Sequence, residues 1–520
     1  MSSEHAMTLR PKQKNEVALR TLFDALVSGG AAIVPHGAID QVRVTGITLD
    51  SRDVRPGDLY VGMPGSKAHG SEFLRQALRN GAVAMVTDAQ GWRLAGDEIP
   101  GIEVENPRIH LGSLSACVYD TDSYDALKFG VTGTNGKTSV IYMLAELVEM
   151  LHMSTGISTT AERRIGEEVI VSSLTSPEAS ELHALLARMK EEHVRAVCVE
   201  ISAQAVVRNR IDGVLFDVVA FNNFSQDHLD EFGSMDAYFS AKSALFSPLH
   251  AKRGVVVVDS QWGRKIVSDS KIPVTTLASE YGSEADWHFA VTSESLDGTS
   301  FVLSGPEGAH FRARVPQLGK FMAENAALAI VMLLEAGIPG TELSNALGSS
   351  GLIEAYIPGR LENMSQDSRI RFYVDYGHTP GAFEVMLDAL NRLVEGRVIM
   401  LFGADGDRDP TKRESMGAIA AKGSDVLIVC DYNPRTEDPA EIRAALLAGA
   451  RSAAESGTEI LEIADPGSAV RKAIEIATPN DVILYAGPGH EEFREVAGKN
   501  IPFSAREEVR IALREAGFNA

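Results

Sequence analysis

The sequence predicts an α/β protein of three domains, and three observations support this fold class. From Leu127 to the C-terminus, short β-branched runs that are apolar on both faces alternate with amphipathic helical stretches, which is typical of parallel strands covered by helices. A helical stretch and the segment AYIPGRLENM, whose Pro-Gly pair ends the helical pattern, divide these strands into two sets. The chain before Leu127 follows a different pattern, so we expect domains at residues 1–126, 127–356 and 357–520.

The expected elements follow in chain order. In the first domain, LDSRDVRPGDLYVGMPG is typical of a strand, a turn and a second strand. Strands of the middle domain are expected at Lys128–Val131, Ala196–Ile201, Val218–Phe221 and Gly254–Val258. The dividing helices are expected at Phe321–Glu335 and Glu342–Leu347. Strands of the third domain are expected at Ile370–Tyr376, Val398–Phe402, Val426–Cys430 and Val482–Ala486.

Composition excludes several classes of function. The 520 residues include 49 Lys and Arg against 71 Asp and Glu, and a net charge of −22 argues against non-specific binding of nucleic acid or anionic lipid. No apolar run reaches the roughly 18 residues that a membrane span requires. The start, MSSEHAMTLRPKQK, lacks the apolar stretch of a secretory signal, so we expect a cytoplasmic protein. Cys117, Cys198 and Cys430 form no CxxC pair, which argues against a zinc site or a disulfide framework.

The strongest local signal is LKFGVTGTNGKTSVIYMLAELVEM, in which a strand leads through a glycine-rich loop into a helix. Backbone N–H groups of such a loop close around phosphate oxygens, and the helix N-terminus adds a favourable partial charge. Lys137 would reach the β- and γ-phosphates and Thr138 would hold Mg²⁺. The strict P-loop pattern has glycine where this chain has Val131, so the loop is a variant. The alternative interpretation is a glycine-rich turn that only caps a helix.

This variant loop resembles the ATP-binding loop of the Mur ligases, enzymes that add amino acids to the peptidoglycan precursor. The resemblance continues in order along nearly the whole chain, through DSRDVRPGDLYV, LTSPEASEL, VEISAQA, NNFSQDHLDEFGSM, PGRLE and VDYGHTPGAF. The segments FGADGDRDPTKR, DYNPRTEDP and AGPGHEEF are similar to the MurE-like branch, the UDP-N-acetylmuramoyl-tripeptide synthetases. The resemblance rests on many motifs that occur in the same order as in the family. No single motif would be sufficient.

The resemblance implies both a reaction and a fold. The fold would comprise an N-terminal UDP-binding domain, a central P-loop ATPase-like domain with a parallel sheet, and a C-terminal Rossmann-like domain. The enzyme would phosphorylate a carboxylate of UDP-N-acetylmuramoyl-L-alanyl-D-glutamate with ATP, and the amine of a third amino acid would then displace phosphate. Charge gathers on the transferring phosphoryl group, so cations matter more than acid–base groups. ATP and Mg²⁺ are the implied cofactors, and the resemblance implies a cytoplasmic enzyme that we expect to be a monomer.

By resemblance, one set of residues binds ATP and the metal. The ATP-binding residues would be Gly133, Thr134, Asn135, Gly136, Lys137, Thr138, Ser139, Arg360 and Asp375. The Mg²⁺ ligands would be Thr138, Glu200, His228 and Lys242, the last as N6-carboxylysine formed with CO₂. Lys137, Glu200, His228 and Lys242 would be the catalytic set. Taken alone, Glu200 also fits a helix-capping acid, His228 a structural histidine and Lys242 an ordinary polar helix residue.

The resemblance also implies where the other two substrates bind. UDP-N-acetylmuramoyl dipeptide would contact Leu49, Ser51, Ser66, Lys67, Ala68, Thr175, Ser176, Ser202, Arg208 and Arg210. The chain departs from the family pattern in GSKAHG, where relatives have GHQADG, in Arg208 for Gln, and in Ala203-Gln204 for Ser-His. The incoming amino acid would contact Arg408, Tyr432, Asn433, Pro434, Arg435, Gly487 and Glu491.

The identity of that amino acid stays open between meso-diaminopimelate and L-lysine or L-ornithine. Arg435 is the arginine of the DNPR segment that pairs with the far carboxylate in relatives that add diaminopimelate, and it favours that substrate here. Tyr432 stands in place of the usual Asp, and GPGHE in place of GKGHE, which favours a shorter diamine.

Three other classes of protein are alternatives to a MurE-like ligase. A folylpolyglutamate synthase would share the P-loop, but the DSR-type first domain and DYNPRTEDP argue against it. A P-loop switch or motor ATPase that makes no amide bond would leave Lys242 and the C-terminal motifs without a role. A catalytically inactive binding module is argued against by the intact Lys137, Glu200 and His228.

Overall fold

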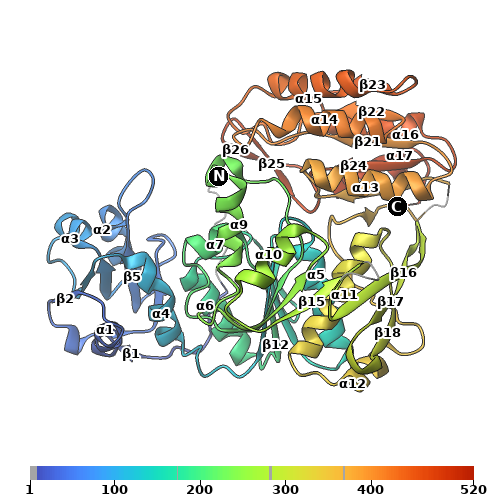
Figure 1. Cartoon of the computed structure of the whole chain (residues 1–520). Coiled ribbons are helices and arrows are strands. Elements are labelled where there is room, and N and C mark those ends of the chain that lie inside the picture. The colour runs from blue at the N-terminus through green and yellow to red at the C-terminus, as the bar shows by residue number, and fades with distance from the viewer. Residues whose placement is uncertain (1–8, 173, 280–283, 367–368, 520) are drawn as a thin grey trace.

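Three large sheets flanked by helices form the body of the chain (Figure 1). The computed structural model describes residues 9–172, 174–279, 284–366 and 369–519, so the first eight residues of the start MSSEHAMTLRPKQK lie outside the described part. The N-terminal domain lies at the left of the middle domain in Figure 1, and the C-terminal domain lies above the middle domain. The predicted three-domain α/β fold class is confirmed.

The N-terminal sheet has the strand order β2-β7-β6-β5-β4 and is parallel except where β2 pairs with β7. Its strands are β2 (Ile33–His36), β4 (Gly46–Thr48), β5 (Asp58–Gly62), β6 (Ala84–Thr87) and β7 (Gly101–Val104). Its helices are α1 (Leu19–Ser28), α2 (Leu74–Asn80), α3 (Ala89–Ala95) and α4 (Pro107–Tyr119), and β1 (Val17–Ala18) pairs with β3 (Arg43–Val44). Of the strand, turn and strand predicted for LDSRDVRPGDLYVGMPG, the turn and the second strand (β5) lie in this segment, whereas the first strand (β4) ends at Thr48, just before it.

The middle sheet has eleven strands in the order β11-β10-β9-β12-β8-β13-β14-β15-β16-β17-β18. The strands from β9 to β16 in this order are parallel, and antiparallel pairs extend both edges. The four predicted strands are β8 (Leu127–Thr132), β12 (Ala196–Glu200), β13 (Phe216–Phe221) and β14 (Ala251–Val257). The others are β9 (Thr155–Ser158), β10 (Glu162–Ile165), β11 (Glu168–Val171), β15 (Val274–Ala278), β16 (Trp287–Ser295), β17 (Gly298–Ser304) and β18 (His310–Val315).

Helices cover both faces of the middle sheet, which is why its central strands are apolar on both sides. In β12, Ala196 and Cys198 pack into the core formed with α5 and α11, whereas Val197 and Val199 pack into the core formed with α6 and α9. The helices are α5 (Lys137–Met150), α6 (Ala179–Glu191), α7 (Ala203–Val207), α8 (Leu229–Phe232), α9 (Met235–Ser243), α10 (Gln261–Asp269), α11 (Lys320–Glu335) and α12 (Gly340–Leu347). The two predicted dividing helices are therefore confirmed as α11 and α12.

The C-terminal sheet has the order β19-β20-β24-β21-β22-β23, and only β19 is antiparallel to its neighbour. Its strands are β19 (Glu362–Asn363), β20 (Arg371–Asp375), β21 (Val398–Phe402), β22 (Val426–Val429), β23 (Glu459–Glu462) and β24 (Val482–Ala486), four of which were predicted. Its helices are α13 (Pro380–Leu393), α14 (Lys412–Gly423), α15 (Pro439–Ala453), α16 (Pro466–Ile476) and α17 (Ala505–Glu515). A hairpin of β25 (Phe493–Val496) and β26 (Lys499–Pro502) follows the sheet.

The strand register places the predicted residues at the carboxyl edges of two sheets. Glu200 ends β12 beside β8, which leads directly into the P-loop, and Asp375 ends β20 beside the end of β24. Ligands of parallel α/β sheets bind in the crevice outside these edges. Within the described residues, no helix is both long and apolar enough to cross a membrane.

Candidate active site

The P-loop is held in a conformation that only its glycines permit. Gly133 has a φ of +148° and Gly136 a φ of +82°, and a Cβ on Gly136 would lie 2.4 Å from Asn222 Nδ2. Lys137 Nζ folds back over the loop and donates to the carbonyls of Gly133 at 3.1 Å and Thr134 at 2.8 Å. The loop therefore presents its backbone at the N-terminus of α5, the arrangement that binds phosphate.

Glu200 has one carboxylate oxygen without a partner. The side chain is fully buried, and its Oε2 accepts a hydrogen bond of 2.7 Å from Thr160 Oγ1, whereas Oε1 has no hydrogen-bond partner. Beside it, Thr138 Oγ1 accepts a hydrogen bond of 2.8 Å from Arg360 Nη2. A buried carboxylate oxygen without a partner is costly, because its desolvation is not compensated. Glu200 Oε1 is therefore suited to a ligand that arrives at the P-loop.

Lys242 is buried against the P-loop rather than exposed on its helix. Its Nζ donates a 2.8 Å hydrogen bond to the carbonyl of Gly133 and lies 4.6 Å from the ring centre of Tyr238. Burial, together with the nearby Lys137 ammonium, lowers the pKa of Lys242 well below its usual value. The interpretation of Lys242 as an ordinary polar helix residue does not fit this environment.

His228 belongs to a loop between β13 and α8, which we call the NNFSQDH loop (residues 222–228). Its backbone is left-handed, with a φ of +53°, and its Nε2 lies 3.4 Å from Asp227 Oδ2. Burial alone would raise the pKa of Asp227, but the charges of His228, His378 and Lys412 outweigh it and bring that pKa to about 2. Asp227 is thus a carboxylate surrounded by cationic and imidazole groups.

The residues at the P-loop fit a magnesium ion. Mg²⁺ takes oxygen ligands and is usually held by one or two carboxylates together with substrate phosphates and water. Glu200 Oε1 and Thr138 Oγ1 are such oxygens, and the first has no partner in the protein. In the ranges that the structure covers, no group of three or more His, Cys, Asp or Glu side chains is placed to hold a metal. A magnesium ion that is held partly by substrate phosphate oxygens does not need such a group of three protein side chains.

Arg360 joins the C-terminal domain to the P-loop, and Asp375 is fixed within the C-terminal domain. The Arg360 guanidinium lies 4.3 Å from the ring centre of Tyr376 and reaches Thr138, while its buried Nη1 has no partner. Asp375 accepts backbone hydrogen bonds from Leu361 at 2.7 Å and Gly377 at 2.5 Å. Burial raises the pKa of Asp375, although the charge of Arg360 opposes this shift. Both Asp375 oxygens are therefore used within the protein.

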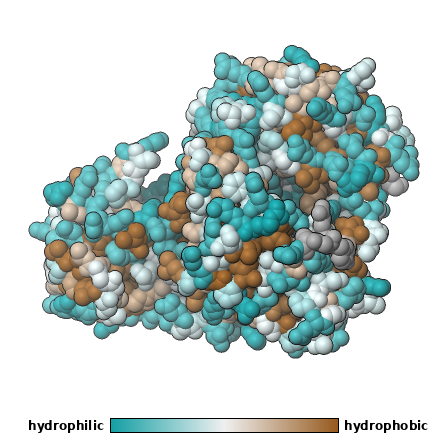
Figure 2. Space-filling model, viewed as in Figure 1, coloured by the Kyte–Doolittle hydropathy of each residue, from teal (hydrophilic) through white to brown (hydrophobic). Residues whose placement is uncertain are grey.

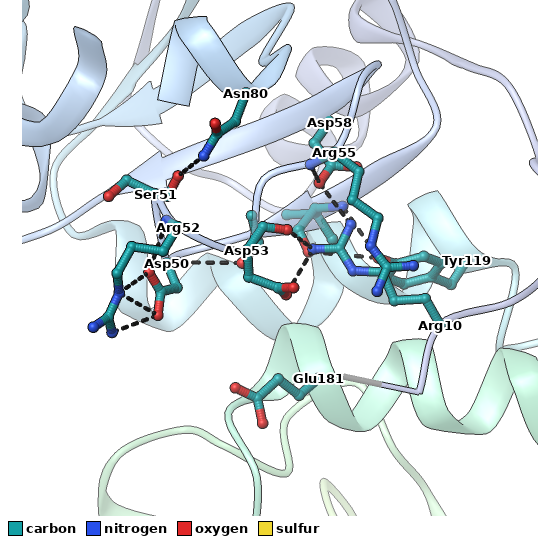
Figure 3. Close-up of polar contacts among 12 residues, drawn as sticks. Arg10, Asp50, Ser51, Arg52, Asp53, Arg55, Asp58, Asn80, Tyr119 and Glu181 are labelled. Carbon is teal, nitrogen blue, oxygen red and sulfur yellow. Dashed lines mark hydrogen bonds and ion pairs between the residues drawn. The ribbon is translucent and has the colours of Figure 1, made fainter. Parts of the chain in front are cut away.

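The predicted UDP-dipeptide residues lie in two groups. In the N-terminal domain, Ser51 donates to Gln76 Oε1 at 3.0 Å and its carbonyl accepts from Asn80 (Figure 3). Leu49 and Ala68 in the same domain are partly exposed, and Ser66 and Lys67 are exposed. Figure 2 shows the molecule hollowed between this domain at the left and the C-terminal domain at the upper right.

The second group lies on the middle domain next to Glu200. Ser176 Oγ donates to the Glu200 carbonyl at 2.8 Å and accepts from the Ser202 backbone at 3.0 Å. Thr175 Oγ1 lies 3.1 Å from Thr160 Oγ1, within hydrogen-bond distance. Two arginines form ion pairs close by, Arg210 with Glu178 at 2.9 Å and Arg208 with Glu231 at 2.5 Å. Thr175, Ser176 and Ser202 are thus brought next to Glu200 at the carboxyl edge of the sheet.

Two of the predicted amino-acid residues, Tyr432 and Asn433, hydrogen-bond a third, Glu491. Its Oε2 accepts hydrogen bonds from Tyr432 Oη at 2.5 Å and Asn433 Nδ2 at 3.1 Å, and its Oε1 accepts from Tyr376 Oη at 3.4 Å. Burial raises the pKa of Glu491, although these donors oppose the shift. Pro434 is buried next to Asn433, and Gly487, with a φ of +115°, directly follows β24.

Arg435 is already paired with two acids. Its Nη1 lies 3.2 Å from Glu495 Oε2 and its Nη2 lies 3.5 Å from Asp405 Oδ1, while its buried Nε has no partner. Its backbone φ is +52°, and it forms an isolated bridge with Val496 of the β25–β26 hairpin. The Nε–H group of the guanidinium is therefore an unused donor.

A small pocket connects the metal and amino-acid groups across two domains. Its lining comes from both, namely Asp227, His228, Asp230, His378, Asp405, Arg408, Asp409 and Lys412. Arg408 and His228, predicted from separate motifs, therefore share one pocket. A larger hollow of about 350 Å³, lined in part by Lys128, Asp217 and Lys252, lies at the opposite, amino end of β8, β13 and β14. It is remote from the P-loop chemistry.

Several residues of the site were not found from the sequence. Thr160 follows β9 and carries no motif, and Tyr376 lies beside the predicted Asp375 without a chemical signal of its own. Lys412 follows Arg408 within GDRDPTKR. It therefore lies in a motif that resembles the family, although no role was predicted for it. Arg10 binds Asp53 at 3.0 Å and Asp58 at 2.6 Å and so anchors the DSRDVRPGD segment (Figure 3).

Comparisons with known proteins agree with this geometry. Three family profiles match in order: "Mur ligase family, catalytic domain" at residues 43–119, "Mur ligase middle domain" at 131–333 and "Mur ligase, glutamate ligase domain" at 359–489. A UDP-N-acetylmuramyl-tripeptide synthetase of Leifsonia xyli subsp. xyli is 53% identical over 93% of this chain and 94% of its own. A UDP-N-acetylmuramoyl-L-alanyl-D-glutamate–2,6-diaminopimelate ligase of Streptomyces coelicolor is 39% identical over 97% and 98%.

Solved structures give the same result. A structure of a UDP-N-acetylmuramoyl-L-alanyl-D-glutamate–2,6-diaminopimelate ligase superposes with a TM-score of 0.63 at 27% identity, over 93% of this chain and 97% of its own. Folylpolyglutamate synthase of Mycobacterium tuberculosis shares the fold alone, with a TM-score of 0.55 at 19% identity over 73% of this chain and 92% of its own.

A P-loop domain joined to two further α/β domains in this order defines an ATP-dependent amide ligase, and the chain belongs to the Mur ligase family. Within the family it is an acid–amino-acid ligase of the UDP-N-acetylmuramyl-tripeptide synthetase (MurE) type, which adds the third amino acid of the peptidoglycan precursor peptide. The family uses ATP. The prediction of this branch over a folylpolyglutamate synthase is confirmed.

Proposed function

We propose that this ligase joins a diamino acid to the D-glutamyl carboxylate of UDP-N-acetylmuramoyl-L-alanyl-D-glutamate, with ATP and Mg²⁺ as cofactors. The observation that carries the proposal is the meeting of Lys137, Arg360 and the unpartnered Glu200 Oε1 at one phosphate-binding loop. We further propose that the enzyme acts in the cytoplasm as a monomer, with domains at residues 1–126, 127–356 and 357–520.

The reaction needs stabilisation of charge at the P-loop. A carboxylate oxygen of the dipeptide bonds to the γ-phosphorus of ATP and the bond to ADP breaks; the incoming amine then bonds to the acyl carbon and phosphate leaves. Lys137 and Arg360 hold positive charge beside the transferring group, where it stabilises the transition state. Mg²⁺, when bound, neutralises phosphate charge, and Thr138, Glu200, His228 and carbamylated Lys242 are the groups proposed to hold it.

The remaining proposed contacts follow from the two domain interfaces. The backbone of the loop from Gly133 to Gly136, with Thr138 and Ser139, binds the ATP phosphates, and Asp375 binds the ribose. The proposed dipeptide contacts are Leu49, Ser51, Ser66, Lys67, Ala68, Thr175, Ser176, Ser202, Arg208 and Arg210. Closure of the domains over these groups would shield the acyl phosphate from water.

Diaminopimelate is one candidate for the third amino acid. Relatives at 39–40% identity from Streptomyces coelicolor and Corynebacterium glutamicum are named as 2,6-diaminopimelate ligases. Arg435 Nε has no partner in the protein, which supports a role in binding a carboxylate at the far end of the substrate side chain.

L-Lysine or L-ornithine is the second candidate, and a specific observation favours it. Arg435 already pairs with Asp405 and Glu495, so its charge is compensated without a substrate carboxylate. Tyr432, which stands where relatives have Asp, donates to Glu491 and adds bulk next to the amino-acid site. An acidic, narrowed pocket suits a side chain that ends in an ammonium group.

A ligation assay with purified enzyme tests both the function and the substrate. The enzyme is mixed with the UDP-muramoyl dipeptide, ATP, Mg²⁺ and each amino acid in turn, and phosphate release and product mass are followed. We expect phosphate release only when both the dipeptide and a diamino acid are present. Release that is independent of either substrate would contradict ligation and favour a P-loop ATPase.

Replacing Arg435 by alanine should change substrate preference. We expect the ratio of kcat/KM for diaminopimelate to that for L-lysine to fall by roughly 10- to 100-fold, since a buried charge-assisted contact with a carboxylate contributes about 1.5–3 kcal/mol. Arg451→Ala, an exposed substitution on α15, is the matched control and should leave the ratio unchanged. An unchanged ratio in Arg435→Ala would show that this arginine does not recognise the amino-acid side chain.

A further inference from the structure

The first half of the NNFSQDH loop is fixed to the P-loop. Asn223 Oδ1 accepts from the Asn135 backbone at 2.9 Å, and Asn223 Nδ2 donates to the Asn135 carbonyl at 3.0 Å. The Ser225 backbone donates to Thr134 Oγ1 at 3.0 Å. Any shift of the P-loop is therefore transmitted directly to this loop.

The second half of the loop contacts the C-terminal domain. Asp227 Oδ1 lies 3.6 Å from Lys412 Nζ, and both residues line the pocket that also contains Arg408 and Asp409. Both ion-pair partners are about nine-tenths buried, with exposed side-chain fractions of 9% and 10%. Lys412 begins α14, directly after the segment that carries Arg408. The contact thus joins the loop to the proposed amino-acid site.

Asp227 also holds the backbone of His228. Its Oδ1 accepts a 3.0 Å hydrogen bond from the His228 N–H, and its Oδ2 lies 3.4 Å from His228 Nε2. A left-handed backbone at a residue other than glycine costs energy and persists only when its surroundings enforce it. Asp227 supplies part of that constraint, and Lys412 in turn determines where the Asp227 carboxylate lies.

A contribution to the stability of the fold does not by itself explain the ion pair between Lys412 and Asp227. Taking two charges out of water costs about as much as their attraction returns, and an apolar pair of similar volume is often equally stable. The pair does fix a position, because it crosses the domain interface next to the pocket shared by His228 and Arg408. Its geometry suits a contact that forms when the domains close.

We propose that Lys412 is a positioning residue of the ligation reaction: through Asp227 it seats His228 and ties that seating to the C-terminal domain segment that carries Arg408. Closure of the C-terminal domain over the amino acid then also places the His228 side chain. The inference rests on the proposed function, because it takes His228 as a metal ligand and Arg408 as an amino-acid contact.

The test compares Lys412→Met with Lys412→Arg and with Lys422→Met, an exposed substitution at the other end of α14. Binding of Mn²⁺ is titrated by electron paramagnetic resonance in the presence of a non-hydrolysable ATP analogue, and kcat for ligation is measured in parallel. In Lys412→Met we expect Mn²⁺ affinity and kcat to fall by about 10- to 100-fold, as they do when a group that orients a metal ligand is lost. Affinity for the ATP analogue should stay close to the wild-type value.

Lys412→Arg should recover most of both losses, and Lys422→Met should match the wild type. Wild-type Mn²⁺ affinity and kcat in Lys412→Met would overturn the proposal, as would a loss that only follows a fall in melting temperature. If Lys412→Met does not fold, Asp227→Asn tests the same pair from the other side, with the same expected losses. A wild-type enzyme that forms no amide product would refute the proposed function, whereas the Mn²⁺ titration tests the role of Lys412 without ligation.

Discussion

Replacing Lys242 by alanine should lower the ligation rate by on the order of 100- to 1,000-fold while the fold stays intact. The buried Lys242 Nζ lies against the Gly133 carbonyl, and burial favours its neutral form, which is the form that reacts with CO₂. In that step the nitrogen of the neutral amine bonds to the carbon of CO₂ and one N–H proton passes to solvent, which converts the neutral amine into an anion. An anion beside Mg²⁺ and the P-loop would help to order the metal, and alanine removes it.

Two measurements separate the carbamate from a purely structural lysine. Short carboxylic acids such as formate or acetate should partly restore turnover in Lys242→Ala, because they return the missing anion. Carbon-13 spectra of enzyme equilibrated with labelled CO₂ should show a carbamate signal in the wild type and none in Lys242→Ala. The matched control is Lys252→Ala, whose exposed lysine pairs with Asp217 at the amino end of the sheet. Near wild-type turnover in Lys242→Ala would contradict the carbamate.

The sequence predicted the central strands that are long apolar runs, and missed the antiparallel edge strands and short internal strands such as β6 and β9. Strands such as β12 and β21 are continuous β-branched or apolar runs, so their position follows from local pattern. Strand β18 has alternating buried and exposed residues, and β16 and β17 are joined by the turn Leu296-Asp297 with Gly298 beginning β17, yet this antiparallel extension was not predicted. The Asp-Gly pair was an available hairpin signal. The parallel strands were easier to predict because their sequences are more strongly apolar than those of the antiparallel strands.

Some residues of the candidate site follow from local sequence patterns, whereas others are brought together only by contacts between distant parts of the chain. The P-loop and the end of β12 are local patterns, and the structure brings them together as expected. The contact of Arg360 with Thr138 joins residues 222 positions apart, and the pair of Lys412 and Asp227 joins two domains. No periodicity encodes such contacts, because they depend on how complete domains pack. The resemblance supplied Arg360, whereas the pairing of Lys412 with Asp227 is seen only in the structure.

Replacing Arg360 by alanine should weaken the chemical step more than the binding of ATP. Its guanidinium bridges Thr138 and the ring of Tyr376, and its buried Nη1 is free to meet charge that develops on the transferring phosphoryl group. A preorganised donor of this kind contributes about 2–4 kcal/mol, or roughly 30- to 1,000-fold in kcat. The KM for ATP should change much less, since the contact strengthens chiefly in the transition state.

Steady-state kinetics of Arg360→Ala, Arg360→Lys and Arg392→Ala decide the point. Arg392 is an exposed arginine on α13 of the same domain, and its replacement should leave both constants unchanged. Arg360→Lys keeps the charge but loses the planar fork that reaches Thr138 and stacks on Tyr376, so its kcat should fall between those of wild type and Arg360→Ala. If Arg360→Ala instead raised the KM for ATP with kcat unchanged, Arg360 would bind ground state and transition state equally. The contact between the domains would then serve ATP affinity and not phosphoryl transfer.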